Sequence, residues 1–324
     1  MTLKLNSTWD KVFPKSKLVK HQKVTFHNHF GIELAADLYL PLKPVTDTAA
    51  LAVCGPFGAV KEQSSGLYAQ TLAEKGFVTL AFDPSFTGES GGYPRDVFSL
   101  DINTEDFQAA VDYLSNLDFV SATKIGIIGI CGWGSIALNA AANDPRIKAT
   151  AAITMYDMPR VGVNGYFDES DANDRYQAKI TASNQRTKDY QTGTYAKAGG
   201  VIDPLPDNAP DFVKQYHAYY KTKRGYHKNS VNSNEGWVLQ ANISWANTKI
   251  LVHPEDLKNA VLMIHGQNAH SLYMGKDTFK KLTGTNKEFY LVPNATHTDL
   301  YDGGDHNYIP FDKLTDFFTH YLSE

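Results

Sequence analysis

Short apolar runs recur along the chain with helical segments between them, and this alternation constrains the fold more than any other feature of the sequence. Each run is apolar on consecutive residues, which predicts strands that are buried on both faces. Strands of this kind that alternate with helices are typical of an α/β protein with a mostly parallel sheet flanked by helices. The runs are residues 51–54, 77–82, 125–130, 149–155, 261–264 and 289–292.

Further elements are expected toward the two ends of the chain. Residues 23–27 and 32–40 predict a hairpin, because the apolar side chains of the second segment recur with a period of two. Helices are expected over 63–75 and from about residue 103 onward. A last helix, which should close the edge of the sheet, carries on one face Phe311, Leu314, Phe318 and Tyr321.

The interval 157–258 breaks this rhythm, since it contains no strong candidate for a buried strand. Connections between elements usually span about 2–6 residues, so a segment of this length needs its own explanation. We expect helices at 209–221 and 237–245. The sequence therefore predicts an α/β core made of residues 1–156 and 259–324, with 157–258 inserted before the penultimate core strand as a helical lid.

The sharpest local feature is a buried strand that leads directly into a glycine-rich turn and a helix. The strand 125–130 is followed by Cys131, and a helix is expected over 136–142. Such a turn, the nucleophile elbow, aims its central side chain out of the sheet and needs small neighbours, here Gly129 and Gly132. We therefore predict that Cys131 is a nucleophile, with its thiolate favoured by the helix N-terminus and by an adjacent base.

The loop after the last predicted strand contains the candidate general base, His297, in the position where a triad of this type has its histidine. The acid is harder to place, because Ala269 stands where many relatives of this fold carry aspartate. Asp157, just after the strand that precedes the insertion, is the predicted acid. The alternatives left open are Asp299 and a cysteine–histidine pair oriented by His270 or Asn268.

Backbone N–H groups near the elbow are the candidate oxyanion hole. The first donor is expected to be Gly132, directly after the nucleophile, and the second to be Phe57 or Gly58 in the loop after the first core strand. Trp133 and His270 are expected to contact the substrate.

Composition narrows the range of partners. The net charge of −4 and the absence of a basic stripe argue against nucleic acid, and no apolar run reaches the ~18 residues of a membrane span. The two cysteines, Cys54 and Cys131, favour free thiols in a reducing cytoplasm. Neither a metal-binding spacing of His and Cys nor a nucleotide-binding glycine loop is present, so no metal and no cofactor are expected. The sequence does not predict the oligomeric state.

Several segments together resemble one known family. The chain is similar to bacterial cysteine-type α/β-hydrolases related to dienelactone hydrolase, in matching segments that keep the same order over nearly the whole chain. The resemblance implies the α/β-hydrolase fold and a Cys131/His297 pair that acts on an ester, a lactone or a thioester. Ala269 and the long insertion depart from dienelactone hydrolase, so its own substrate does not carry over. The matching segments are residues 58–63, 72–77, 88–92, 129–131 and 297–302.

Taken together, these features predict a hydrolase that forms a covalent acyl-cysteine intermediate on a small-molecule acyl substrate. A peptidase of the prolyl-oligopeptidase type is an alternative, and it would need a group in the lid that binds a peptide terminus. A non-catalytic binding module on the same fold is another, because a fold does not by itself establish activity. The candidate lid residues for a peptide terminus are Arg160, Arg175 and Arg224.

Overall fold

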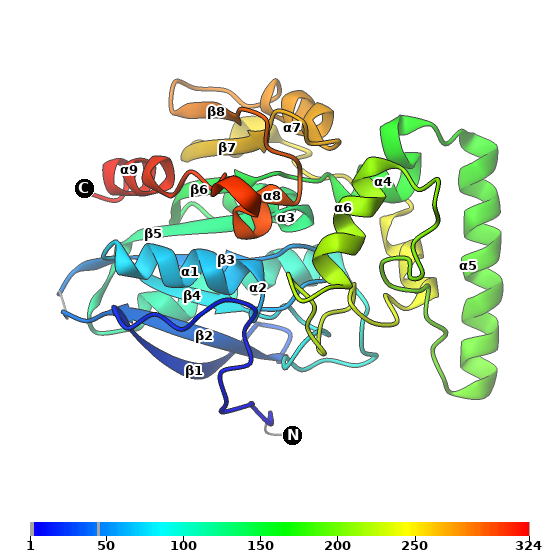
Figure 1. Ribbon diagram of the computed structural model, residues 1–324, viewed down its shortest axis with the longest axis horizontal. Helices are drawn as coiled ribbons and strands as arrows, with labels where there is room; N and C mark the ends of the chain where they lie inside the picture. The colour runs from blue at the N-terminus through cyan, green and yellow to red at the C-terminus, as the bar shows by residue number, and fades with distance from the viewer. Residues whose placement is uncertain (1–2, 44–45, 324) are drawn as a thin grey trace.

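The computed structural model describes residues 3–43 and 46–323, and within these ranges eight strands form a single sheet (Figure 1). The strands are β1 (Val19–His27), β2 (Glu33–Pro41), β3 (Thr48–Cys54), β4 (Val78–Phe82), β5 (Val120–Ile130), β6 (Ile147–Ile153), β7 (Ala260–Gly266) and β8 (Lys287–Val292). Their order in the sheet is β1-β2-β4-β3-β5-β6-β7-β8. β2 is antiparallel to both of its neighbours, whereas all the other pairs are parallel. The predicted mostly parallel sheet is confirmed.

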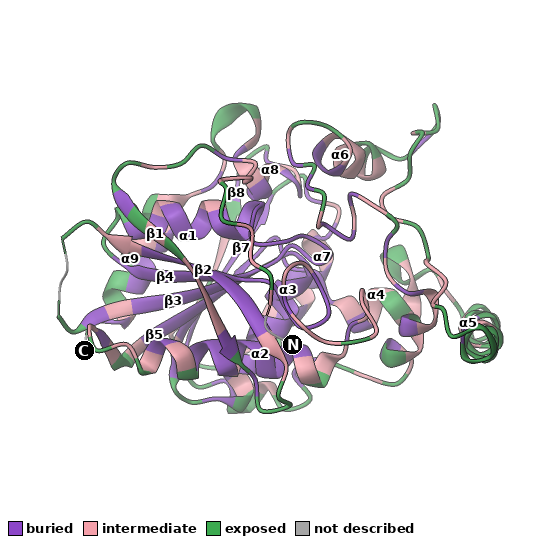
Figure 2. Ribbon diagram, turned by 90° about the horizontal axis from the view of Figure 1, so that it is seen from below, coloured by how far each residue is buried: buried purple, intermediate pink, exposed green. Residues whose placement is uncertain are grey.

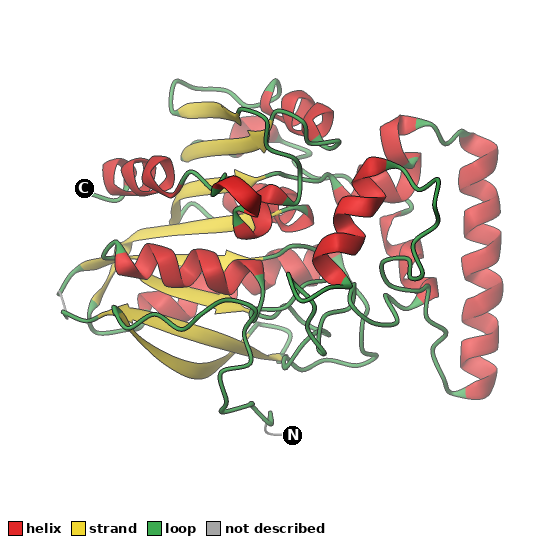
Figure 3. Cartoon of the chain, in the orientation of Figure 1, coloured by secondary structure: helices red, strands yellow, loops and turns green. Residues whose placement is uncertain are grey.

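Helices cover both faces of this sheet, as the yellow strands and red helices of Figure 3 show. Ile127 and Ile128, which are consecutive in β5, belong to different core clusters, as expected for a strand buried on both faces. The first cluster contains α2 and α3 residues, and the second contains α1 and α9 residues. The helices of the core are α1 (Ser64–Glu74), α2 (Leu100–Ser115), α3 (Gly132–Asn143), α7 (Leu272–Phe279), α8 (Asp299–Asp302) and α9 (Phe311–Tyr321).

The segment between β6 and β7 is helical and lies beyond one end of the sheet (Figure 1). α5 stands farthest from the sheet, and most of its surface is exposed (Figure 2). Among the described residues, no helix has both the length and the apolar character that crossing a membrane requires. The elements of the segment are α4 (Met158–Asn164), η1 (Tyr166–Asp168), α5 (Ala172–Thr192), α6 (Asp211–Tyr220), η2 (Leu239–Trp245) and η3 (Pro254–Asp256).

The structure corrects several of the predicted helices. The helix expected over 136–142 begins at Gly132, directly after Cys131. The helix expected from about residue 103 begins earlier, at Leu100, after the extended N-cap Ser99. The helix expected over 237–245 is a 3₁₀-helix. The sequence analysis missed α5 because this helix has no apolar stripe facing a core. The overlooked signal was its capping box. The Asp171 side chain accepts from backbone N–H groups of the first turn, and the Asp174 side chain accepts from the backbone N–H of Asp171.

Candidate active site

Cys131 occupies the predicted sharp turn between β5 and α3, with φ 57° and ψ −124°. A positive φ is costly for a residue with a side chain, so neighbouring structure must hold it. The N–H of Cys131 donates to the carbonyl oxygen of Ile153 in β6 at 2.9 Å, and its own carbonyl accepts from the N–H of Tyr156 at 2.9 Å. Gly129 is required beneath the turn, because a Cβ there would lie 2.0 Å from the carbonyl oxygen of Trp133.

Three hydrogen-bonding groups surround the thiol. The backbone N–H groups of Gly132 and Phe57 donate to Sγ, and the hydroxyl of Tyr301 is hydrogen-bonded to it. Burial raises the pKa of the Cys131 thiol, and these three hydrogen bonds offset only part of that rise. Burial therefore favours the protonated thiol, which opposes the predicted preference for a thiolate at the helix N-terminus.

His297 is fully buried, and both nitrogens of its ring are hydrogen-bonded. Nε2 lies 3.0 Å from the Tyr301 hydroxyl, while Nδ1 lies 3.0 Å from Thr154 Oγ1 and 2.7 Å from Ser271 Oγ. Burial lowers the pKa of His297 far below its ordinary value, and the nearby His270 and His265 lower it further. The imidazole is therefore neutral. Within the described ranges, Sγ and Nε2 share no direct hydrogen bond but meet at the hydroxyl of Tyr301.

The predicted acid, Asp157, does not reach His297. Its carboxylate caps α4 by accepting the backbone N–H of Arg160 at 3.1 Å. The alternative Asp299 instead accepts from the backbone N–H and the hydroxyl of Thr296, at 2.8 and 2.7 Å.

Two hydroxyl groups occupy the place where a triad acid would stand. Thr154 directly follows β6, and Ser271 lies in the loop after β7, so they come from the same two strand ends at which the sequence analysis sought a carboxylate. The sequence analysis missed them because it considered carboxylates, His270 and Asn268 as partners of the imidazole but no hydroxyl group.

A pocket of about 310 Å³ opens above Cys131. The described residues that line it include no Asp, Glu, Lys or Arg, so the cavity favours an uncharged ligand. Parts of its wall come from the loop that carries Phe57 and from α4, α6 and α8. The lining residues are Phe57, Cys131, Tyr156, Met158, Val161, Tyr166, Gly199, Gly200, Val201, Ile202, Phe212, Val213, Tyr216, Asn232 and Tyr301.

The structure places the two predicted substrate contacts outside this lining. Trp133 is 1% exposed and packs edge-on against Phe82 and Phe107 in the core, because α3 turns its side chain away from the pocket. His270 lies behind the wall, where its Nε2 is hydrogen-bonded to the hydroxyls of Tyr156 and Tyr216 at 3.1 and 3.3 Å. Its role is therefore to hold two tyrosines that do line the pocket.

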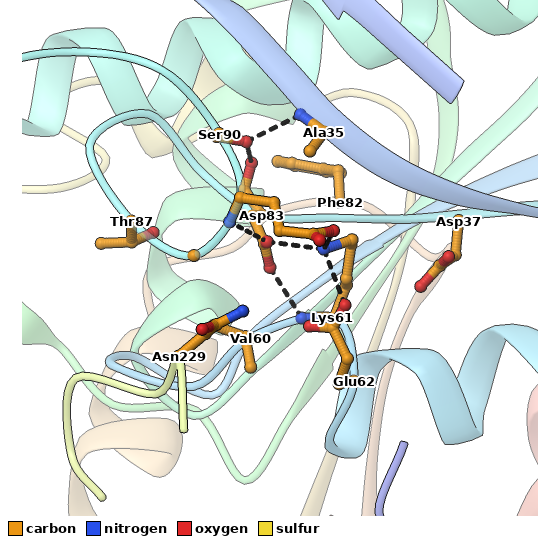
Figure 4. Close-up of polar contacts among 12 residues, drawn as sticks. Ala35, Asp37, Val60, Lys61, Glu62, Phe82, Asp83, Thr87, Ser90 and Asn229 are labelled. Carbon is orange, nitrogen blue, oxygen red and sulfur yellow. Dashed lines mark hydrogen bonds and ion pairs between the residues drawn. The ribbon is translucent and has the colours of Figure 1, made fainter. Parts of the chain in front are cut away.

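A buried ion cluster fixes the loop that carries Phe57 (Figure 4). The ammonium group of Lys61 is fully buried and contacts the carboxylates of Asp83, Glu62 and Glu89 at 2.8, 2.8 and 2.7 Å. Burial alone would lower the pKa of Lys61, but these carboxylates raise it well above its ordinary value. Because the backbone N–H of Lys61 also donates to Asp83, the cluster holds the loop by its main chain as well as by its side chains.

The segment between β6 and β7 also ties the catalytic loops in place. The side-chain amide of Asn232 donates to the carbonyl oxygen of Phe57 at 2.7 Å, and the Ser230 hydroxyl donates to that of Gly58 at 2.9 Å. With its carbonyl held in this way and a φ of 82°, Gly58 supports the turn, while the N–H that reaches Sγ comes from Phe57. Arg224 forms a two-pronged ion pair with Asp302 in α8, the helix after His297.

Comparison with known proteins gives a consistent picture over most of the chain. Residues 31–299 match the model of the family described as X-Pro dipeptidyl-peptidase (S15 family). The uncharacterised protein PA2218 of Pseudomonas aeruginosa is 50% identical over 99% of this chain and 86% of its own length. Its crystal structure superposes with a TM-score of 0.95 over 99% of both chains.

More distant relatives share the same fold. The uncharacterised protein YcjY of Escherichia coli K12 is 34% identical over 87% of this chain and 93% of its own length. The α/β-hydrolase GrgF from Penicillium sp. sh18 is 19% identical, with a TM-score of 0.76 over 94% of this chain and 100% of that one. At this level of identity the likeness to GrgF concerns the fold alone, which is the α/β-hydrolase fold.

The ion cluster predicts a large stability cost for Lys61→Met. Removal of the ammonium group leaves the buried carboxylate of Asp83 without its counter-ion, and leaves Glu62 and Glu89 to share Lys23 alone. We therefore expect the free energy of unfolding to fall by about 3–5 kcal/mol. Urea denaturation measures this change. Lys75→Met is the matched control, because Lys75 pairs with the exposed carboxylate of Asp312 at the surface, where a pair contributes about 1 kcal/mol or less. Equal losses in the two variants would contradict the role given to the cluster.

The protonation state of Cys131 predicts slow alkylation near neutral pH. Since burial raises the pKa of this thiol, the thiolate fraction at any pH below it is smaller than in a free cysteine, with a pKa of ~8.5. We expect iodoacetamide to modify Cys131 more slowly than it modifies the urea-unfolded protein at pH 7.5. The rate should still increase above pH 9, as followed by peptide mass spectrometry. A rate that levels off below pH 8 would show a resting thiolate instead.

Proposed function

Since the chain belongs to the X-Pro dipeptidyl-peptidase (S15) family and is a hydrolase of the α/β fold, we propose that it cleaves an uncharged ester, lactone or thioester through a covalent acyl intermediate on Cys131. The observation that carries this proposal is the position of Sγ. It lies at a strained elbow on the floor of an uncharged pocket, with the N–H groups of Phe57 and Gly132 directed at it.

These groups suit an acyl transfer to water. Sγ attacks the substrate carbonyl carbon while its proton passes to His297, and the N–H groups of Phe57 and Gly132 stabilise the negative oxygen of the tetrahedral intermediate. The protonated imidazole returns the proton to the departing alcohol or thiol as the bond to it breaks. Water, deprotonated by the same imidazole, then releases the acid and restores the thiol.

The neutral pair has a mechanistic consequence. Because the thiol and the imidazole are both uncharged at rest, His297 has to act as a general base during the attack, as it would for a serine nucleophile. Thr154 and Ser271 fix the imidazole through Nδ1 but bring no negative charge to stabilise the imidazolium. A thiol tolerates this arrangement better than a hydroxyl, since it is the more acidic group.

The family match makes peptide cleavage the second candidate. A dipeptidyl-peptidase binds a substrate with a free ammonium terminus, and a buried ammonium group needs a carboxylate partner. The described residues that line the pocket provide tyrosine hydroxyls and amides but no carboxylate. This favours an uncharged acyl group over a peptide N-terminus.

We also propose that residues 157–258 act as a lid over the catalytic core. Tyr166, Phe212 and Tyr216 from this segment complete the wall opposite Cys131, so without it the thiol would face solvent. A reducing compartment such as the cytoplasm suits a catalytic thiol, and Cys54 and Cys131 are both free.

Replacement of the nucleophile tests the proposal directly. We expect Cys131→Ala to lose about 10³-fold or more of the activity on p-nitrophenyl butyrate and on a butyryl thioester, because the covalent route disappears. The wild type, quenched during turnover, should carry the butyryl group on the peptide that contains Cys131. Cys54→Ala is the control, since Cys54 is buried in β3, where its thiol donates to the carbonyl of Phe82.

Other outcomes separate the candidate functions. Full activity in Cys131→Ala would sink the covalent mechanism. Hydrolysis of aminoacyl-p-nitroanilides at rates that rival ester hydrolysis would favour the peptidase. A folded protein that turns over none of these substrates and forms no acyl adduct would point to a binding module.

A further inference from the structure

The hydroxyl of Tyr301 lies between the two catalytic groups. It is 3.0 Å from Nε2 of His297 and is also hydrogen-bonded to Sγ of Cys131. Tyr301 is fully buried in α8, four residues after His297, and it is one of the residues that line the pocket. The proton that leaves Sγ therefore meets the phenol before it meets the imidazole.

We propose that Tyr301 is a catalytic residue that relays the proton between Cys131 and His297, an inference that rests on the acyl-transfer function proposed above. As Sγ forms its bond to the carbonyl carbon, the S–H bond breaks and its proton passes to the phenol oxygen. In the same step the phenol O–H bond breaks, and that proton passes to Nε2. The phenol is neutral before and after, and the charge appears as imidazolium and as the oxyanion.

The hydrogen bonds around His297 are compatible with this direction of transfer. If the neutral imidazole carries its hydrogen on Nδ1, it can donate to the hydroxyl oxygen of Ser271 or Thr154, and Nε2 is then free to accept from Tyr301. The phenol oxygen keeps lone pairs that can accept from the thiol. Each donor in the chain from Sγ to Nδ1 thus has an acceptor.

The surroundings of Tyr301 keep it in the protonated form that a relay needs. Its ring packs edge-on against Tyr219 at 5.0 Å between ring centroids, with Tyr220 at 6.3 Å. Burial raises the pKa of Tyr301 well above its ordinary value, so the phenol transfers one proton only while it gains another. A tyrosine that acted as a base by itself would require the opposite environment.

The test is the acylation rate of Tyr301→Phe in the full chain. A relay predicts that the burst of p-nitrophenol from p-nitrophenyl butyrate slows by about 10²-fold or more, as in His297→Ala, because general-base assistance is lost. The double variant should be no slower than either single variant, since the two residues act as one unit. Tyr219→Phe is the matched control: it removes a hydroxyl from a neighbouring buried tyrosine outside the pocket lining, and we expect the wild-type rate.

Solvent isotope measurements separate a relay from a structural role. Two protons move in the proposed step. A plot of the wild-type acylation rate against the D₂O fraction should therefore be curved. That curve should become linear in Tyr301→Phe. A Tyr301→Phe variant that acylates as fast as the wild type, or faster, while His297→Ala stays slow would overturn the relay and show direct transfer to His297.

The relay remains testable even if the wild type forms no acyl adduct, an outcome that would refute the proposed function by itself. In that case the rate at which iodoacetamide alkylates Cys131 at pH 7.5 is measured instead of acylation, because Sγ loses its proton in this reaction too. Equal slowing in Tyr301→Phe and His297→Ala would support the relay. An unchanged or increased rate in Tyr301→Phe would overturn it.

Discussion

The backbone of Cys131 is the point on which the rest of the site depends. Its positive φ is maintained by two hydrogen bonds: its N–H donates to Ile153 at the end of β6, and its carbonyl accepts from Tyr156 in the loop that follows β6. These bonds place the thiol above the carboxyl ends of the parallel strands, where the loops after β3, β6, β7 and β8 converge. Apart from Gly132, which follows Cys131 directly, the other groups of the proposed mechanism come from those loops, so their positions relative to Sγ follow from the register of the sheet.

Charge is segregated around this point. The Lys61 cluster brings three carboxylates together with the ammonium groups of Lys61 and Lys23 next to the loop that carries Phe57, whereas the described lining of the pocket is uncharged. These ions hold the loop by contacts with one another, and none of their side chains belongs to the described lining of the pocket. Phe57 lines the pocket, and its loop is held by the Lys61 cluster. The position of its backbone N–H is therefore fixed by ions that take no part in the proposed chemistry.

The neutrality of the site is compatible with the proposed mechanism, in which His297 has hydroxyl partners in place of a carboxylate. A triad acid stabilises an imidazolium, but it also introduces a buried charge that has to be solvated. Here Thr154 and Ser271 take its place with hydroxyl groups, and burial lowers the pKa of His297 accordingly. The imidazolium is then a short-lived state, which suits a nucleophile as acidic as a thiol.

The segment between β6 and β7 joins these parts together. Asn232 and Ser230 donate hydrogen bonds to the carbonyl groups of the loop that carries Phe57. Arg224 forms an ion pair with Asp302, in the helix that carries Tyr301. The loop that carries Phe57 and the helix that carries Tyr301 are thus both attached to residues 224–232, and movement of this stretch would disturb the proposed oxyanion donors and the proposed base together.

The sequence by itself determined the sheet, the elbow at Cys131 and the place of His297, because each depends on residues that are close together in the chain. Consecutive apolar residues must be buried wherever the strand lies, and a strand that meets glycine and a helix must turn sharply. Only the tertiary structure decided what touches these residues. Which of two N–H groups reaches Sγ, which side chains bond Nδ1, and the place of Tyr301 between Cys131 and His297 depend on contacts between distant segments. Burial, which sets the pKa of the thiol and of the imidazole, exists only once all those segments have packed.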